Sequence, residues 1–106
     1  MRILLDNCVP VRLGRSIIGH DTKSVVHLGW AALTDGALLD AMTGKFDVLV
    51  TVDRSLPLQQ NMAGRPFALI VLRANSNRLG DLSPLVPVLL RELKSVNPGD
   101  VRVIGR

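Results

Sequence analysis

The sequence predicts an α/β domain with a largely parallel central sheet of about five strands. Short runs rich in Val, Ile and Leu alternate with segments whose apolar residues recur at helical spacing. Strands that alternate with helices imply βαβ crossovers, and such crossovers join parallel strands. The strongest strand signal, at residues 46–53, is apolar at nearly every position, which is typical of a strand covered on both faces.

The first strand is expected at residues 2–5, because this apolar run is stopped by Asp6 and Asn7. Pro10 then opens a helix, since its fixed φ suits a first helical turn. Gly19 closes that helix, and His20 follows as a turn residue. The apolar face of the helix consists of Val11, Leu13, Ile17 and Ile18.

The second strand is expected at residues 23–27. After a loop, a helix covers residues 37–42, and Gly44 ends it. Either Thr34 or Asp35 supplies the N-terminal cap, because both side chains accept hydrogen bonds from the first free N–H groups.

The third strand is residues 46–53, where β-branched residues dominate. Pro57 starts a short helix that continues to Asn61, and residues 66–72 form a fourth buried strand. A longer helix begins at Leu79 or Ser83 and ends at Ser95, and a last strand covers residues 101–104. Two prolines fall in the first turns of the longer helix, where a missing N–H is tolerated, namely Pro84 and Pro87.

Length and composition indicate one domain over residues 1–106, of which 47% are hydrophobic. No apolar run approaches the roughly 20 residues needed to cross a bilayer, and no secretory signal pattern follows Met1. We therefore expect a cytoplasmic protein that does not enter membranes. Cys8 is the only cysteine, which excludes an internal disulfide and a thiolate metal cluster.

The charge balance favours a polyanionic partner. Thirteen Lys and Arg against nine Asp and Glu give a net charge of +4, and ten of the thirteen cations are Arg. Arg suits bidentate contact with phosphate. A platform that stacks successive bases is not expected, because Trp30, Phe46 and Phe67 are the only aromatic residues.

Three carboxylates are expected to meet at one edge of the sheet. Asp6 follows the first strand, Asp53 ends the third, and Asp35 stands at a helix N-terminus. The carboxyl ends of parallel strands and the N-termini of their crossover helices share an edge, where ligands bind. Three like charges there need a compensating cation, and Mg²⁺ or Mn²⁺ prefers oxygen ligands. The alternative for each residue is a purely structural cap or turn.

The chain resembles the small stand-alone PIN-like proteins, which are regarded as toxin components of toxin-antitoxin pairs. The resemblance covers nearly the whole chain and rests on the order and spacing of several short motifs. These are residues 4–10 (LLDNCVP), 19–21 (GHD), 34–39 (TDGALL), 46–54 (FDVLVTVDR), 59–61 (QQN), 72–74 (LRA) and 77–79 (NRL).

The resemblance implies a three-layer α/β/α domain with acids around Mg²⁺ or Mn²⁺, and single-stranded RNA as substrate. At matching positions Asp6, Asp35 and Asp53 would bind the metal, and Thr51 would orient a water or an acid. A water activated by the metal would cleave the RNA, and a cognate antitoxin would restrain the enzyme. A homodimer is left open. Many relatives have Glu where this chain has Asn7 and Ala37.

Several cations precede or follow the segments that reach this edge and are candidates for holding RNA phosphates. Asn7, Arg12, Arg54 and Arg73 are the expected substrate-binding residues, and Arg15 and Arg78 are further candidates. Scattered, solvated Arg side chains are the alternative.

Five other residues have a functional and a structural interpretation. Cys8 is a candidate nucleophile, but a buried small residue is favoured. His20 is favoured as a turn residue, whereas His27 is a candidate ligand or proton-transfer group. Trp30 either stacks a base or closes its loop over the core, and the second is favoured. Asp40 either points to the cleft or, as favoured, lies on a solvated helix face.

Two other functions stay open. A PIN-like domain that has lost its chemistry would act as a binding module, which the missing acids at Asn7 and Ala37 favour. A receiver-like module with Asp53 as phosphoacceptor also fits the placement of Asp6 and Asp53. Receivers, however, carry an acidic pair after the first strand and a Lys after the last, where this chain has a single acid and Gly105-Arg106.

Overall fold

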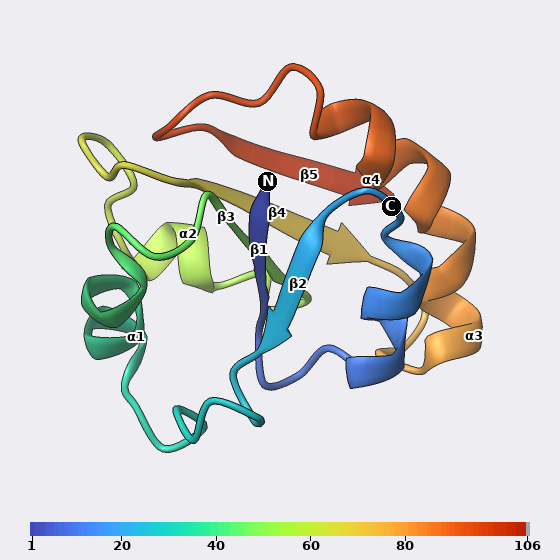
Figure 1. Ribbon diagram of the computed structural model, residues 1–106, viewed down its shortest axis with the longest axis horizontal. Coiled ribbons are helices and arrows are strands. Elements are labelled where there is room, and N and C mark those ends of the chain that lie inside the picture. Colours follow the sequence, from blue (N-terminus) through green and yellow to red (C-terminus); the bar gives the residue numbers. More distant parts are fainter. Residues whose placement is uncertain (106) are drawn as a thin grey trace.

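Five parallel strands in the order β2-β1-β3-β4-β5 form the centre of the computed structural model, which describes residues 1–105 (Figure 1). Every neighbouring pair is parallel, so the expected α/β class and the parallel sheet are confirmed. The strands are β1 (Arg2–Leu5), β2 (Asp21–Ser24), β3 (Val48–Thr51), β4 (Ala68–Arg73) and β5 (Val101–Gly105).

Helices cover both faces of the sheet (Figure 1). One face carries α1 (Asp35–Met42) and α2 (Leu56–Gln59), and the other carries η1 (Val11–Ser16), α3 (Leu79–Leu82), η2 (Ser83–Leu85) and α4 (Val86–Glu92). Side chains of β1 alternate between the two layers, since Leu4 packs with the α1 side whereas Ile3 and Leu5 pack with the η1 side. The three-layer arrangement follows from this alternation.

The third strand is shorter than expected, because its two ends belong to other structures. Phe46 donates its N–H to the Met42 carbonyl at the end of α1, so β3 begins only at Val48. At the other end the Asp53 N–H bonds to the Thr51 hydroxyl, which turns the chain away from the sheet. All four residues of β3 are buried, as expected for a central strand.

The prediction of the first helix is wrong in the type of helix and in which of its apolar residues are buried. Residues 11–16 form a 3₁₀ helix, and Ile17 after it has φ −88° and ψ 70°, which is not helical. Val11 and Ile18 are therefore 41% and 77% exposed, while Leu13 and Ile17 are buried. The contact of η1 with β2 needs Gly14, since a Cβ there would lie 2.8 Å from Thr22 Oγ1.

The second strand starts and ends earlier than the sequence predicts. It pairs only with β1, which offers four partners, so the register ends at Leu5 with Ser24. The Val25 N–H still reaches the Leu5 carbonyl, but the Ser24 hydroxyl then accepts from the Val26 N–H and starts a turn. Residues 25–27 consequently leave the sheet.

The expected long helix is broken into three short ones, α3, η2 and α4. Pro84 and Pro87 lie in the first turns of η2 and α4, because each lacks the N–H that would continue the preceding helix. Helix α4 ends at Glu92 rather than Ser95. Helix α2 covers residues 56–59 instead of 57–61, with Pro57 in its first turn.

Across residues 1–105, no helix combines the length and the apolar character that a membrane span requires.

Asp47 ties the start of β1 to the segment before β3. Its Oδ2 accepts from the Arg2 N–H at 2.7 Å, its Oδ1 faces the Arg2 guanidinium at 3.2 Å, and its N–H donates to the Arg2 carbonyl at 2.7 Å. These hydrogen bonds, first that of the guanidinium and then that of the N–H, lower the pKa of Asp47 against the opposing effect of burial. The β1–β3 pairing is thereby anchored at its amino end.

Replacing Asp47 with Ala should lower the free energy of unfolding at pH 7 by about 1–2 kcal/mol, because the Arg2 N–H loses its acceptor. Since the folded pKa is lowered, the stabilisation is present above the ordinary value of 3.8 and is lost as pH falls through the folded pKa. Urea unfolding from pH 7 to pH 3 checks this, and the two stabilities should converge on acidification. Asp21→Ala, which removes an exposed 4.0 Å ion pair with Lys23, is the control and should change little.

Candidate functional site

The three predicted carboxylates line one pocket at the carboxyl edge of the sheet. Asp6 follows β1, Asp53 follows β3, and Asp35 is the first residue of α1. The pocket has a volume of about 320 Å³. Its other walls are Asn7, Cys8, Val25, Trp30, Ala31, Leu33, Leu38 and Val52. The tertiary structure thus brings together the acids that the sequence places at one edge.

Thr51 connects two of the three acids. This residue is completely buried at the end of β3, and its hydroxyl donates to Asp6 Oδ2 at 2.7 Å. The same oxygen accepts the Asp53 N–H at 3.0 Å. A second bond, from the Asn7 N–H to Asp6 Oδ1 at 2.7 Å, fixes the Asp6 carboxylate from the other side. Asp6 therefore has one defined orientation.

The Asp53 carboxylate is held by the turn that follows β3. Its Oδ1 accepts from the Ser55 N–H at 2.9 Å and from the Ser55 hydroxyl at 2.6 Å. Within residues 1–105 no hydrogen bond reaches Oδ2, so that oxygen keeps its lone pairs for a ligand. Ser55 was not predicted as a site residue, although an Asp followed two residues later by Ser is a common local turn pattern.

Asp35 stands in the first turn of α1, which Thr34 caps by accepting the Ala37 N–H at 3.3 Å. Burial raises the pKa of Asp35, and the negative charges of Asp53 and Asp6 raise it further. The Asp35 side chain has no hydrogen-bond donor among the described residues. Asp35 is thus a half-buried carboxylate whose charge is opposed by its two acidic neighbours.

The three acids of the pocket supply oxygen atoms, the type of ligand that a hard divalent cation prefers. All three side chains offer carboxylate oxygens, and a cation between them would relieve the repulsion that raises the Asp35 pKa. As they lie in the structure, however, no three His, Cys, Asp or Glu side chains among residues 1–105 are grouped so that they could hold a metal ion. Mg²⁺ suits such an incomplete set, because it usually keeps several waters and uses one or two carboxylates.

Of the four expected substrate-binding residues, one lines the pocket of the three acids, called the acidic pocket below. Asn7 is exposed and lines the acidic pocket, whereas Arg12 and Arg54 are exposed and do not line it. Arg73, at the end of β4, lines a separate pocket of about 250 Å³. Its Nε is buried without a hydrogen-bond partner in the described part of the chain. The role of these four residues in binding a substrate therefore stays a prediction.

Cys8 is half-buried, and its Sγ lies 3.6 Å from Thr51 Oγ1 and 3.9 Å from Asp6 Oδ2.

Trp30 packs on the core and contacts Phe46 edge-on, with 6.2 Å between the ring centroids, so it closes its loop over the core, as the sequence favours. Asp40 is exposed and pairs with Arg65 at 2.7 Å, which confirms a solvated helix face.

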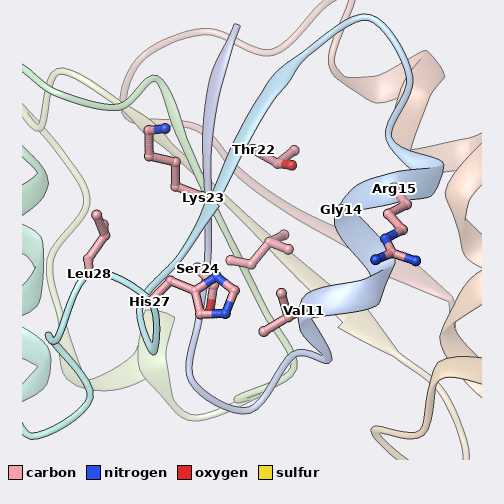
Figure 2. A pocket seen from close by; sticks show the side chains of 9 residues that line it. Val11, Gly14, Arg15, Thr22, Lys23, Ser24, His27 and Leu28 are labelled. Atoms are coloured by element: carbon pink, nitrogen blue, oxygen red, sulfur yellow. The ribbon is translucent and has the colours of Figure 1, made fainter.

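The two histidines differ in surroundings. His20 Nδ1 lies 3.2 Å from the N-terminal amine, and burial, followed by that positive charge, lowers its pKa. It follows Gly19 in the turn before β2, as the sequence predicts. His27 lies outside the acidic pocket and lines a larger one, of about 600 Å³, between η1 and β2 (Figure 2). No pattern in the sequence predicts this larger pocket, because its walls come from separate segments that only the fold brings together.

Comparison of the chain with protein-family models, curated proteins and solved structures finds no match.

Asp35→Asn should raise the free energy of unfolding at pH 7, by up to about 1 kcal/mol after solvent screening, because it removes one of three repelling charges. A raised carboxyl pKa destabilises the fold only while the group is ionised. The gain should therefore disappear as pH falls below the ordinary value of 3.8. Urea unfolding at pH 7 and pH 3 measures both. Asp40→Asn, on the same helix but paired with Arg65, should show no gain; equal gains would contradict the repulsion.

Thr51→Val should destabilise the protein by about 2 kcal/mol, because Asp6 loses a donor and the buried Asp53 N–H loses its acceptor. Thr51→Ser, which retains the hydroxyl, is the matched variant. Amide hydrogen exchange at Asp53 tests the loss of this acceptor directly, apart from the overall loss of stability. In Thr51→Val the Asp53 N–H should exchange faster than the change in global unfolding explains. In Thr51→Ser it should not. Unchanged protection in the Val variant would show that the hydroxyl does not hold this turn.

Proposed function

We propose that this protein is a cytoplasmic, metal-dependent ribonuclease of PIN-like type that cleaves single-stranded RNA and is restrained by a cognate antitoxin. One observation carries the proposal. Asp6, Asp35 and Asp53 line a single pocket at the carboxyl edge of a parallel sheet, and the charges of Asp6 and Asp53 raise the pKa of Asp35. Carboxylates that destabilise one another in a pocket are typical of a functional site.

Each acid has its own part in this proposal. Asp6 is fixed by Thr51 and by the Asn7 N–H. Asp53 is held through Oδ1 by Ser55, so its Oδ2 has no hydrogen bond among the described residues. Asp35 adds a third carboxylate from the start of α1. When bound by these oxygens, Mg²⁺ or Mn²⁺ supplies charge neutralisation at the scissile phosphate and activation of water.

The strongest competing interpretation is a PIN-like domain without chemistry that serves as a binding module. Asn7 lines the pocket without a charge, and Ala37 on α1 provides no carboxylate, so the site has three acids where many relatives of that family have more. This interpretation predicts a folded protein that neither binds the metal tightly nor cleaves RNA. The partner would then be a protein, either an antitoxin or a second copy.

A receiver-like phosphoacceptor is the second candidate, and the strand order favours it. The order β2-β1-β3-β4-β5 is that of flavodoxin-like sheets, to which receivers belong, with Asp53 after β3 and Asp6 after β1. Fold alone does not establish function. Acetyl phosphate labelling of Asp53, read by mass spectrometry and lost in Asp53→Asn, would support this candidate.

Asp53→Asn should abolish metal binding and RNA cleavage and leave the fold intact, because an Asn Oδ1 can still accept both Ser55 hydrogen bonds. Calorimetric titration with Mn²⁺ and with Mg²⁺, followed by incubation of the same samples with a mixed single-stranded RNA, measures both properties. The loss of cleavage should exceed about a hundredfold, as for removal of a group that stabilises transition-state charge.

Asp40→Asn is the matched control, since its carboxylate lies on the solvated face of α1 and pairs with Arg65. This variant should bind metal and cleave RNA like the unmodified chain. Metal-dependent cleavage that persists in Asp53→Asn would overturn the assignment of the site. A well-folded chain that binds neither metal would support the binding module instead.

A further inference from the structure

The largest pocket described in the structure, about 600 Å³, lies between η1 and β2 and outside the acidic site (Figure 2). Arg15 and Val11 of η1, Thr22 and Ser24 of β2, and His27 of the turn after β2 line it. Its volume is in the range of pockets that hold small ligands. None of the three acids lines this pocket, and the proposed metal site does not use it.

Hydrogen-bond donors in this pocket lack protein acceptors. Within residues 1–105, Arg15, Thr22 and His27 make no side-chain hydrogen bond or ion pair. Ser24 is 3% exposed, and its Oγ accepts from the Val26 N–H, so its hydroxyl hydrogen is left without an acceptor among the described residues. Buried hydroxyls normally find partners. The pocket therefore offers a guanidinium, an imidazole and two hydroxyls to an external acceptor.

The charge of the pocket selects an anion. None of the side chains that line it is acidic, although the acidic pocket lies close by in the fold. Lys23 also borders it, but its amino group points away from Arg15 in Figure 2 and lies 4.0 Å from Asp21. Arg with hydroxyl donors is the usual set that binds phosphate oxygens.

The remaining walls suit the organic part of a nucleotide. Leu5, Val11 and Leu28 provide apolar surface beside the donors. Gly14 keeps η1 close to β2, because a Cβ there would lie 2.8 Å from Thr22 Oγ1, and so fixes the distance between the two sides of the pocket. An isolated inorganic anion would leave most of this volume empty.

The pocket between η1 and β2, called the basic pocket below, adjoins the acidic pocket at the ends of two strands, β1 and β2. Leu5 lines the basic pocket and the next residue, Asp6, lines the acidic one. Ser24 and Val25 are divided in the same way, and the Val25 N–H donates to the Leu5 carbonyl at 2.9 Å. The two pockets thus open on either side of the ends of β1 and β2.

We propose that the basic pocket binds one nucleotide of the RNA strand, with Arg15, His27 and the Ser24 and Thr22 hydroxyls as the donors to its phosphate and sugar oxygens. This site would hold the strand next to the nucleotide whose phosphate lies at Asp6, Asp35 and Asp53. The inference rests on the proposed ribonuclease function, and it adds the path along which the RNA strand would lie beside the acidic pocket. A protein strand added to the edge of β2 is disfavoured, because Asp21 and Lys23 place charges there.

The test is binding of a fluorescent single-stranded RNA oligonucleotide, followed by anisotropy in EDTA so that no cleavage occurs. Arg15→Gln should weaken binding about tenfold at low salt, because one charge-assisted phosphate contact is lost. The slope of log affinity against log salt should also decrease by about 0.7, the value for one phosphate contact on a single strand. His27→Asn should also weaken RNA binding, because the imidazole is one of the proposed donors.

Arg91→Gln is the matched control, since Arg91 is an exposed Arg on α4 with no ion pair among the described residues. It should leave both the affinity and the salt slope unchanged. Equal effects of Arg15→Gln and Arg91→Gln would overturn the site, as would an absence of RNA binding in the unmodified chain. Metal titration and cleavage by the unmodified chain test the proposed function separately.

A second arm distinguishes a polynucleotide from a small anion. The chain has two histidines, so the ring resonance of His27 is assigned with His27→Asn and followed by NMR. RNA should shift His27 and leave His20 in place, and inorganic phosphate or a mononucleotide should do so only at much higher concentration. Saturation by inorganic phosphate with no response to RNA would overturn the proposal in favour of a small-anion site.

Discussion

The parallel pairing of β1 with β3 is the constraint on which the candidate site depends. The register places Leu5 beside Val50, and the Asp6 N–H continues the ladder by donating to the Val50 carbonyl at 2.9 Å. Residue 6 and residues 52–53 therefore leave the sheet at the same place, directly after Thr51. The hydrogen bond from Thr51 to Asp6 then converts this backbone proximity into a fixed carboxylate. A shift of one residue in this register would turn Thr51 to the opposite face and separate the two groups.

Charged side chains are paired at the amino end of the sheet, whereas the three acids and Arg15 in the pockets at its carboxyl end have no ion pair among the described residues. At the amino end, Arg2 and Asp47 neutralise one another across β1 and the start of β3. At the carboxyl end, three acids gather on the α1 side, and Arg15 and His27 line the pocket on the η1 side. Ion pairs that would cancel these groups are absent from both pockets within residues 1–105. Unpaired charge at a sheet edge is costly to the fold, and it is useful only when a ligand of opposite charge compensates it.

The contrast between Asp47 and Asp35 shows which acids serve stability. Hydrogen bonds from Arg2 lower the pKa of Asp47, so its ionised form stabilises the fold. Burial and two neighbouring acids raise the pKa of Asp35, so its ionised form opposes the fold. Residues that a protein retains at such a cost are expected at functional sites. The same contrast separates Asp40, which is exposed and paired, from the acids of the pocket.

The sequence by itself determined the α/β class, the five strands and the three acids at one edge, because burial of Val, Ile and Leu and the rules of parallel crossovers depend on local pattern. It also determined the Thr34 cap region and the core role of Trp30. Only the tertiary structure decided the ends of β2 and β3, the 3₁₀ form of η1 and the division of the long helix, since these depend on which partner each backbone group finds. The pocket between η1 and β2 likewise required the fold, because Arg15 and His27 line it only where Gly14 of η1 approaches Thr22 of β2, and no periodicity in the sequence predicts that approach.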